Sequence, residues 1–323
     1  MQTNYSENID CHRANMPAAV HVGDMVGIIA PASPIKNEFL CQGELYLQNM
    51  GFKTMTAKNI FHRMHHVAGS VQDRLDDMYQ MFTHDEVKAV FAARGGYGSV
   101  HLLDQLDYAL LAEYPKLLVG YSDITALQLA LWSKIRLSSL SGPMVATEMA
   151  RPDTINDLLL RSILAGTLPE ANKLASAYLQ DDNVRFLRAK NVVVRGRLLG
   201  GTLSVLSALA GTPYFPDLTG AVLILEERGE RIYQLDRYLS HLRLAGVFEQ
   251  VAMVVVGALM LPDPRENYLL PGFINNFFAA DSFPLISGFC YGHCPRSFIF
   301  PQGIDVEFNL TERSISFLSH WVL

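Results

Sequence analysis

Side chains of the types that nucleophilic catalysis requires stand at the ends of separate apolar runs in this chain. Ser122 follows the run 117–119 in "LLVGYSDITALQLAL". Glu226 and Glu227 close the run in "LILEERGE", and His293 follows a glycine in "SGFCYGHCP". A histidine can remove the proton of a serine hydroxyl, and a carboxylate can hold the histidine in the required tautomer. These residues are therefore candidates for a nucleophile, its base and an orienting acid.

Each candidate also has a simpler interpretation. Ser122 or Asp123 could cap the helix that the following residues predict. An acid at a strand end is often only solvated, and a histidine in a turn is usually structural. The combination is more informative than its parts, because a tight turn from strand to helix lifts a side chain out of a sheet and directs backbone N–H groups toward what it attacks.

The segment "ARGGYG", residues 93–98, follows a predicted strand and could supply further N–H groups. Adjacent glycines adopt positive φ easily and allow the backbone to approach an anion or a developing oxyanion, although a plain turn explains them equally well. The pattern G-x-G-x-x-G and a phosphate-loop lysine are absent, which disfavours nucleotide binding. The turn at Ser122 also lacks the second glycine of the G-x-S-x-G elbow, so an α/β-hydrolase is not indicated.

The elements that would position these residues alternate between strand and helix. We expect strands at 26–30, 87–93 and 117–119, and helices at 39–50, at 71–82 and after the third strand as far as residue 132. This alternation predicts an open, mostly parallel sheet with ligands at the carboxyl ends of its strands. Polar sequence at 151–190 indicates a linker with one helix and no clear strand. Residues 191–323 indicate a second α/β domain, richer in β-strands, with helices at 202–210 and 235–246.

These patterns divide the chain into a disordered or extended N-terminus (1–20), an α/β domain with the serine (21–150), a linker (151–190) and a second domain with the acid and the histidine (191–323). A length of 323 residues fits two domains with a substantial interface. The site is then expected in the cleft between the domains.

Composition excludes several function classes. Half of the residues are apolar, 18% are charged, and the net charge is −6 without any basic block, so we expect neither nucleic-acid nor membrane binding. The longest strongly apolar stretch, 251–261, is too short to cross a bilayer, and the N-terminus lacks a secretory pattern. We therefore expect a cytoplasmic protein with a small soluble ligand.

The cysteines predict reduced thiols rather than a disulfide framework. The four are Cys11, Cys41, Cys290 and Cys294, which are too few and too scattered for such a framework in a chain of this size. The segment "CYGHC" offers Cys290, His293 and Cys294 to a metal, but no second cluster with zinc-like spacing accompanies it. We expect no metal.

Several motifs together carry a resemblance to a known family. In chain order they are "AGSVQDRLDDMYQMF", "VKAVFAARGGYG", "PKLLVGYSDITALQLAL", "SGPM", "GRLLGGTLSVLSALAGTPYFPDLTGAVLILEE", "YQLDRYLSHLRLAGVF" and "YGH". They resemble the LD-carboxypeptidase family of serine peptidases, which includes muramoyl-tetrapeptide carboxypeptidases and microcin C immunity peptidases. The resemblance extends from about residue 22 to the end of the chain.

The resemblance implies a Ser–Glu–His triad at Ser122, Glu226 and His293, with the backbone N–H groups of Gly96 and Asp123 as the oxyanion hole. Family members commonly read Leu-Glu-Asp at 225–227, which favours the first acid and leaves Glu227 as the alternative. The cysteine after the histidine is a departure from the family pattern. Arg94 and Arg231 are candidates for binding a substrate carboxylate.

The same resemblance implies a flavodoxin-like N-terminal domain, a C-terminal domain of β-strands with helices, a homodimer, and no metal or organic cofactor. The implied reaction removes the terminal D-alanine from the murein tetrapeptide L-Ala-D-Glu-(diamino acid)-D-Ala during cell-wall recycling. One alternative keeps the triad but cleaves a peptidyl-nucleotide or another amide. That branch tends to carry a loop with aromatic residues, and the 150–190 region has Tyr178 and Phe186 but no tryptophan. The other alternative, a murein-peptide sensor without catalysis, is disfavoured because all three triad residue types are present.

Overall fold

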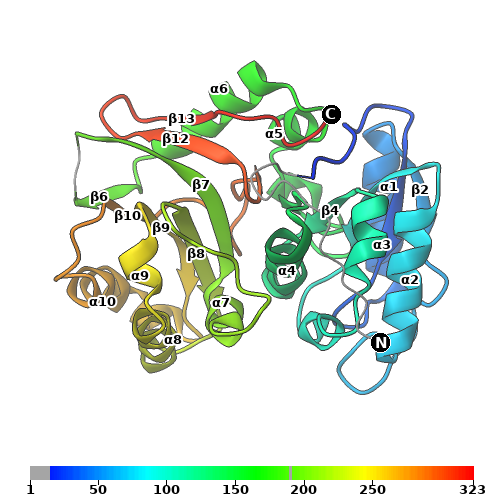
Figure 1. Ribbon diagram of the computed structural model, residues 1–323, viewed down its shortest axis with the longest axis horizontal. Coiled ribbons are helices and arrows are strands. Elements are labelled where there is room, and N and C mark those ends of the chain that lie inside the picture. The colour runs from blue at the N-terminus through cyan, green and yellow to red at the C-terminus, as the bar shows by residue number, and fades with distance from the viewer. Residues whose placement is uncertain (1–14, 189–190) are drawn as a thin grey trace, which may run out of the picture.

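Two β-sheets flanked by helices make up the computed structural model of the chain (Figure 1), which describes residues 15–188 and 191–323. The first sheet has the strand order β11-β5-β4-β3-β1-β2. Its five parallel strands are β1 (Met25–Ile29), β2 (Lys53–Thr56), β3 (Val87–Ala92), β4 (Leu117–Gly120) and β5 (Leu140–Ser141). The spatial order 2-1-3-4-5 is that of flavodoxin-like folds, which confirms the expected class of the N-terminal domain.

The sixth strand of this sheet comes from the far end of the chain. β11 (Phe300–Pro301) pairs antiparallel with β5 at the sheet edge. The C-terminal segment therefore contributes to the N-terminal sheet, a crossing that the sequence patterns did not predict.

Helices cover both faces of the first sheet. They are α1 (Asn37–Asn49), α2 (Val71–Thr83), α3 (Tyr108–Glu113) and α4 (Thr125–Ile135). Successive strand residues point to opposite faces, so Ile28 lies in one core cluster with Leu47 of α1, whereas Ile29 lies in the other with Met78 of α2. Burial on both faces explains why the strands read as continuous apolar runs. The helices expected at 39–50 and 71–82 are confirmed.

α2 also organises the loops beside the carboxyl ends of β1 and β3. Ser70 accepts from the N–H of Asp73, and the carboxylate of Asp73 accepts from the N–H of Ser70, which starts the helix in a capping box. One turn into the helix, Arg74 is 2% exposed and donates from Nη1 to the carbonyls of Pro31 (2.9 Å) and Gly98 (2.7 Å). The glycine turn at 93–98 is thus tied to the loop after β1.

The second sheet has the order β13-β12-β7-β8-β9-β10-β6. Its central strands β7 (Val193–Thr202), β8 (Val222–Arg228), β9 (Met253–Met260) and β10 (Leu285–Ser287) are parallel. β6 (Arg185–Arg188), β12 (Asp305–Asn309) and β13 (Ser314–Phe317) are antiparallel additions at the edges. The accompanying helices are α7 (Leu203–Leu209), α8 (Ile232–Leu244), α9 (Val247–Gln250) and α10 (Leu270–Phe277). The expected β-rich α/β domain is confirmed.

The segment 151–190 holds more structure than one helix. It contains α5 (Asp157–Leu164), α6 (Leu168–Leu179) and the strand β6. α5 starts where the side chain of Asn156 accepts from the N–H of Leu159. The expectation of no strand was wrong, because the short, polar "RFLR" becomes a strand by pairing with β10, about a hundred positions later.

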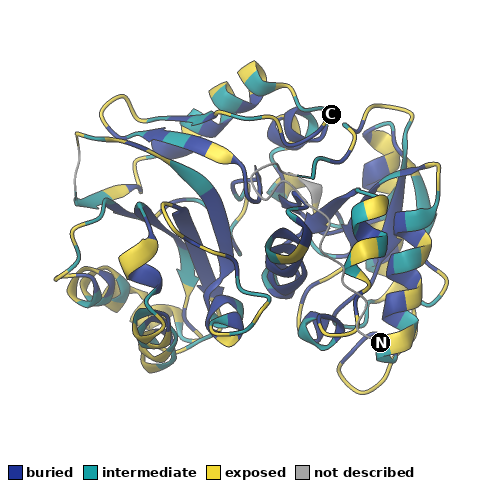
Figure 2. Cartoon of the chain, viewed as in Figure 1, coloured by how far each residue is buried: buried dark blue, intermediate teal, exposed yellow. Residues whose placement is uncertain are grey.

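α4 lies between the two halves of the molecule and is dark blue in Figure 2 because residues 125–132 are all buried. A helix that is apolar on all sides requires such a place. Its first residue, Thr125, packs against the end of β7, where a Cβ on Gly201 would lie 2.4 Å from the threonine side chain. This close approach requires glycine and brings the start of α4 against the second sheet.

The expectation of a disordered or extended N-terminus falls partly outside the described residues, since these begin at Asn15. Residues 15–20 are tied to the body of the protein: the N–H of Asn15 donates to Arg136 O, and that of Val20 to Leu164 O. In the part of the chain that is described, the helices are all too short or too polar to cross a membrane.

Candidate active site

Ser122 occupies a strained turn between β4 and α4. Its φ is +61°, in the left-handed region that residues other than glycine seldom adopt, and such strain is common at functional sites. The side-chain amide of Gln128 holds the turn by donating to the carbonyls of Gly120 and Leu140, each at 2.8 Å. Ser122 lines a cavity of about 500 Å³.

The glycine turn after β3 lies directly against this serine. A Cβ on Gly95 would lie 3.1 Å from Ser122 Oγ and 3.3 Å from the backbone nitrogen of Asp123. Gly96 also lines the cavity, with φ at +105° and its missing Cβ directed at Ser33. Asp123 stands at the start of a helix, where N–H groups have no intrahelical partner. Gly96 therefore lines the same cavity as Ser122, and Asp123 is the residue next to that serine, while Gly95 is a contact that sequence reasoning missed.

Asp123 uses its side chain to join this turn to the glycine segment. Its Oδ2 accepts from the N–H of Ser99 at 2.8 Å, and its carbonyl accepts from the Ser99 hydroxyl. Burial raises the pKa of the Asp123 carboxyl, although the bonds from Ser99 and the charge of Arg74 oppose the shift. The side chain has a structural role that leaves its backbone N–H available.

His293 is hydrogen-bonded to a buried acid from the second sheet. Its Nδ1 lies 2.8 Å from Oε2 of Glu226, which is 0% exposed, and the Thr202 hydroxyl donates to the other carboxylate oxygen. Burial alone would lower the pKa of His293, but the hydrogen bond and charge of Glu226 outweigh it and raise that pKa above its ordinary value. With Nδ1 engaged, Nε2 is the ring nitrogen left to exchange a proton.

Glu227, the alternative acid, points elsewhere. Its oxygens accept from the N–H groups of Ser204 (2.7 Å), at the start of α7, and of Arg228 (2.9 Å). The register between β8 and β9 shifts between Leu225 and Glu227, and such a bulge redirects neighbouring side chains. Of the two adjacent acids, the structure brings Glu226 to His293.

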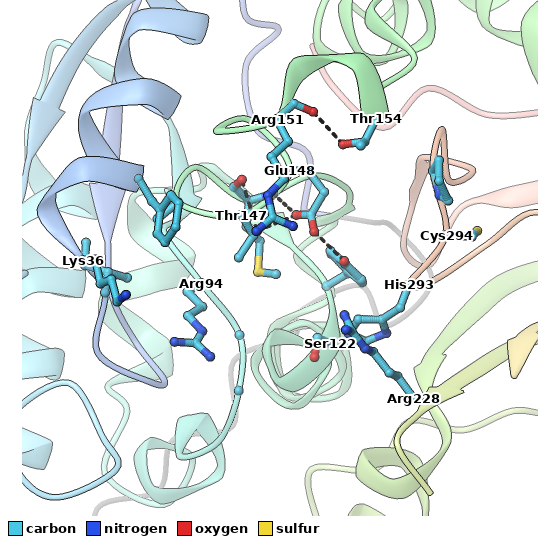
Figure 3. Close-up of a pocket in the computed structure, with 18 residues that line it drawn as sticks. Lys36, Arg94, Ser122, Thr147, Glu148, Arg151, Thr154, Arg228, His293 and Cys294 are labelled. Carbon is cyan, nitrogen blue, oxygen red and sulfur yellow. Dashed lines mark hydrogen bonds between the residues drawn. The ribbon is translucent and has the colours of Figure 1, made fainter. Parts of the chain in front are cut away.

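The cavity is formed by both halves of the chain, which confirms the expected position in the interdomain cleft. Ser122 and the glycine turn line one side, and Arg228 and His293 line the other. Figure 3 shows Ser122 and His293 as neighbours in this cavity. Within the described residues, no hydrogen bond joins their side chains. Catalytic hydrogen bonds often tighten only when a substrate is bound.

Cationic side chains form part of the cavity lining. They are Lys36, Arg94, Arg151 and Arg228, whereas Glu148 is the one acid among the described residues that line it. Arg94, one of the two candidates for binding a substrate carboxylate, lines the cavity. Arg231, the other candidate, is exposed at the start of α8 and is not part of the described lining, because the chain turns away at Gly229 after β8 ends. Arg228, which ends that strand, lines the cavity instead.

Sequence reasoning also missed a tyrosine and an acid beside the histidine. The ring centroid of Tyr121 lies 5.0 Å from that of His293, and its hydroxyl donates to Glu148 at 2.7 Å. The other oxygen of Glu148 accepts from Met144 N and the Thr147 hydroxyl. In the sequence, the position of Tyr121 directly before Ser122 could have indicated that this tyrosine belongs to the site.

Cys294 lines the same cavity, and its sulfur lies 3.6 Å from that of Cys290, so the pair is not a disulfide. The contact with Cys290, together with burial, raises the pKa of Cys294 and disfavours its thiolate. Among the described residues, no group of three or more His, Cys, Asp or Glu side chains is arranged to hold a metal ion.

Family models match both halves of the chain. The model of the LD-carboxypeptidase N-terminal domain matches residues 26–142, and that of the C-terminal domain matches residues 195–308. The chain belongs to the LD-carboxypeptidase family. The resemblance inferred from the motifs is thereby confirmed, and the cavity between the two halves is the candidate active site of this LD-carboxypeptidase family member.

Curated relatives of the family cover nearly the whole chain. A protein named probable murein peptide carboxypeptidase from Bacillus subtilis is 31% identical over 301 residues, which is 92% of each chain. The murein tetrapeptide carboxypeptidase of Pseudomonas aeruginosa is 30% identical over 283 residues, 86% of this chain and 91% of its own.

A solved structure shares the fold at lower sequence identity. It is the microcin C7 self-immunity protein MccF in complex with aspartyl sulfamoyl adenosine, with a TM-score of 0.84 and 22% identity. The match covers 95% of this chain and 99% of the other. At this identity the likeness supports the shared fold.

Proposed function

We propose that this protein is a serine LD-carboxypeptidase that releases the terminal D-alanine from murein tetrapeptides. The observation that carries the proposal is the hydrogen bond from His293 to the buried Glu226, in the same cavity as a serine held in a left-handed turn. This is the arrangement required to activate a hydroxyl as a nucleophile.

In the proposed mechanism, Ser122 Oγ attacks the carbonyl carbon of the last peptide bond while His293 Nε2 accepts the hydroxyl proton. The N–H groups of Asp123 and Gly96 stabilise the negative oxygen of the tetrahedral intermediate. The C–N bond then breaks, and His293 returns the proton to the departing amine. Water, deprotonated by His293, hydrolyses the acyl-enzyme. Glu226 fixes the tautomer and stabilises the imidazolium throughout.

The charge of the cavity favours an acidic peptide. The described lining contains four cationic side chains and one acid, Glu148, which already accepts three hydrogen bonds. A murein tetrapeptide carries carboxylates on its glutamate and its terminal alanine, which such a cavity attracts. The names of the two curated relatives, both murein peptide carboxypeptidases, support the same substrate class.

A peptidyl-nucleotide substrate fits the cavity less well. The aromatic residues considered for stacking on a base lie elsewhere: Tyr178 is buried against Phe289 and Phe298, and Phe186 is on β6. Neither belongs to the described cavity lining. A tetrapeptide therefore accounts better for the residues that are present.

The proposal is tested by incubating the purified protein with murein tri-, tetra- and pentapeptides and identifying the products by mass spectrometry. We expect the tetrapeptide to yield tripeptide and free D-alanine, with little reaction of the pentapeptide. A tetrapeptide ending in L-alanine is the matched control. Failure to cleave the D-alanine tetrapeptide would refute the proposal, and equal cleavage of both tetrapeptides would remove the LD specificity while leaving a serine peptidase.

The expected setting is part of the same proposal. We expect a cytoplasmic homodimer that acts on peptides returned from the cell wall, in keeping with the family resemblance of the motifs. Cell fractionation and light scattering of the purified protein would check these two points.

A further inference from the structure

Arg228 is a cation without an ion-pair partner, placed beside the proposed base. It follows Glu226 and Glu227 at the end of β8 and lines the cavity together with His293. Among the described residues, no acid lies within ion-pair distance of its guanidinium, whose charge acts on His293 to lower the pKa of the imidazole. Figure 3 shows Arg228 next to His293, whereas Arg94 and Lys36 lie across Ser122 from the histidine.

The chemistry of peptide cleavage assigns different parts of the substrate to these two sides. The base that takes the serine proton later gives it to the departing nitrogen, so the departing residue lies on the His293 side. In a carboxypeptidase this residue has a free carboxylate, whose carbon is two bonds, roughly 2.5 Å, from that nitrogen. Arg228, next to His293, is therefore on the side where this carboxylate binds. Arg94, across Ser122 from the histidine, is on the side of the acyl part of the substrate.

We propose that Arg228 binds the terminal carboxylate of the departing residue and thereby restricts cleavage to the last peptide bond. This inference rests on the proposed function, which it deepens by naming the residue that makes the site an exopeptidase. A longer peptide places a neutral amide where Arg228 requires a negative charge, so the guanidinium loses its partner upon binding. The fork of an arginine suits a carboxylate because two N–H groups can donate in parallel.

The test compares two substrates that differ only in this charge: the tetrapeptide as the free acid and the same tetrapeptide as the C-terminal carboxamide. We expect the wild-type protein to favour the acid in kcat/KM by roughly 10- to 100-fold, the usual range for hydrogen bonds to a charged group. Arg228→Met should lose this preference by slowing cleavage of the acid, whereas cleavage of the amide should not slow, because the amide no longer leaves a guanidinium without a partner. Arg228→Lys, which keeps the charge, should retain part of it.

Two matched arginine variants control for other effects. Arg231→Met removes a cation three positions away, outside the described cavity lining, and should keep the preference of the wild-type protein. Arg94→Met removes a cation from the acyl side of the cavity and should change kcat/KM for the acid and the amide to the same extent. Because the charge of Arg228 also lowers the pKa of His293, each ratio is measured on the plateau of the pH profile, where His293 is neutral.

A binding measurement separates this inference from the proposed function. In the Ser122→Ala background, calorimetry should show tighter binding of the acid than of the amide, and adding Arg228→Met should abolish the difference. If the affinity difference between the acid and the amide depends on Arg228 but the wild-type protein cleaves neither substrate, Arg228 keeps its binding role and the proposed peptidase activity is refuted. If Arg228→Met preserves the discrimination, or weakens both substrates equally, Arg228 does not bind the carboxylate.

Discussion

Nδ1 of His293 lies 2.8 Å from a carboxylate oxygen of Glu226, although the two residues are 67 positions apart. The contact depends on Gly292, whose φ is +102° and whose missing Cβ would lie 2.5 Å from Oε2 of Glu226. A backbone that passes this close to the acid directs the next side chain, the imidazole, back onto it.

Ser122→Ala should abolish turnover and leave the fold intact. Loss of the nucleophile from such a triad costs on the order of 10⁶ in kcat, and alanine removes only the hydroxyl. Peptide hydrolysis measures the effect, with circular dichroism as the control for folding. Wild-type turnover by the folded variant would exclude Ser122 as the nucleophile.

Glu226→Gln should reduce kcat by on the order of 10³ to 10⁴, because a neutral amide neither stabilises the imidazolium nor fixes its tautomer. Glu227→Gln is the matched variant and should remain active, since the oxygens of Glu227 accept from the N–H groups of Ser204 and Arg228 at α7 and β8 and lie away from His293. Steady-state kinetics of the two variants distinguish the acids. An inactive Glu227→Gln beside an active Glu226→Gln would reverse the assignment.

The acidic limb of the kcat/KM profile should lie above the ordinary pKa of histidine. Glu226 raises the pKa of His293, and the proposed base works only when neutral, so activity is lost as the pH falls through this raised value. Glu226→Gln removes the negative charge and should move the limb to lower pH. A limb that stays in place in that variant would show that another group titrates.

Gly292→Ala should impair catalysis more than strain alone explains. Any side chain there meets Glu226 and also occupies positive φ. Gly229→Ala is the control, because Gly229 has φ at +86° but open space around its missing Cβ, so it reports only the backbone strain of about 1–2 kcal/mol. Denaturation and kinetics on both variants compare the two effects. Equal losses of activity would exclude the steric role of Gly292.

Cys294→Ser should retain most activity although Cys294 lines the cavity. Its raised pKa leaves little thiolate at neutral pH, so it is poorly suited to replace Ser122 as nucleophile. Mass spectrometry of a trapped acyl-enzyme checks the assignment. An adduct on Cys294 rather than Ser122 would contradict it.

The strands and helices near the site were predictable from local sequence, because each buries an apolar pattern that its own residues display. The strand before Ser122, β4, is fully buried, and the helix after it, α4, is mostly apolar and buried over residues 125–132. The glycine turn, the acids near the end of β8 and the histidine turn could be recognised for the same reason: glycine or polar residues interrupt the apolar pattern at or near the end of an element.

Tertiary structure decided how neighbouring residues divide their roles. Glu226 and Glu227 are adjacent acids at the end of one apolar run, but as successive residues of β8 they point in opposite directions, one to His293 and the other to the start of α7. Arg228 lines the cavity and Arg231 is outside its described lining, because the chain turns away from the cavity at Gly229, between the two residues. Residues 185–188 form the strand β6 because they pair with β10, which is distant in sequence. Local sequence determines which residues can form elements and do chemistry, whereas direction and partnership depend on contacts between segments far apart in the chain, which no local pattern contains.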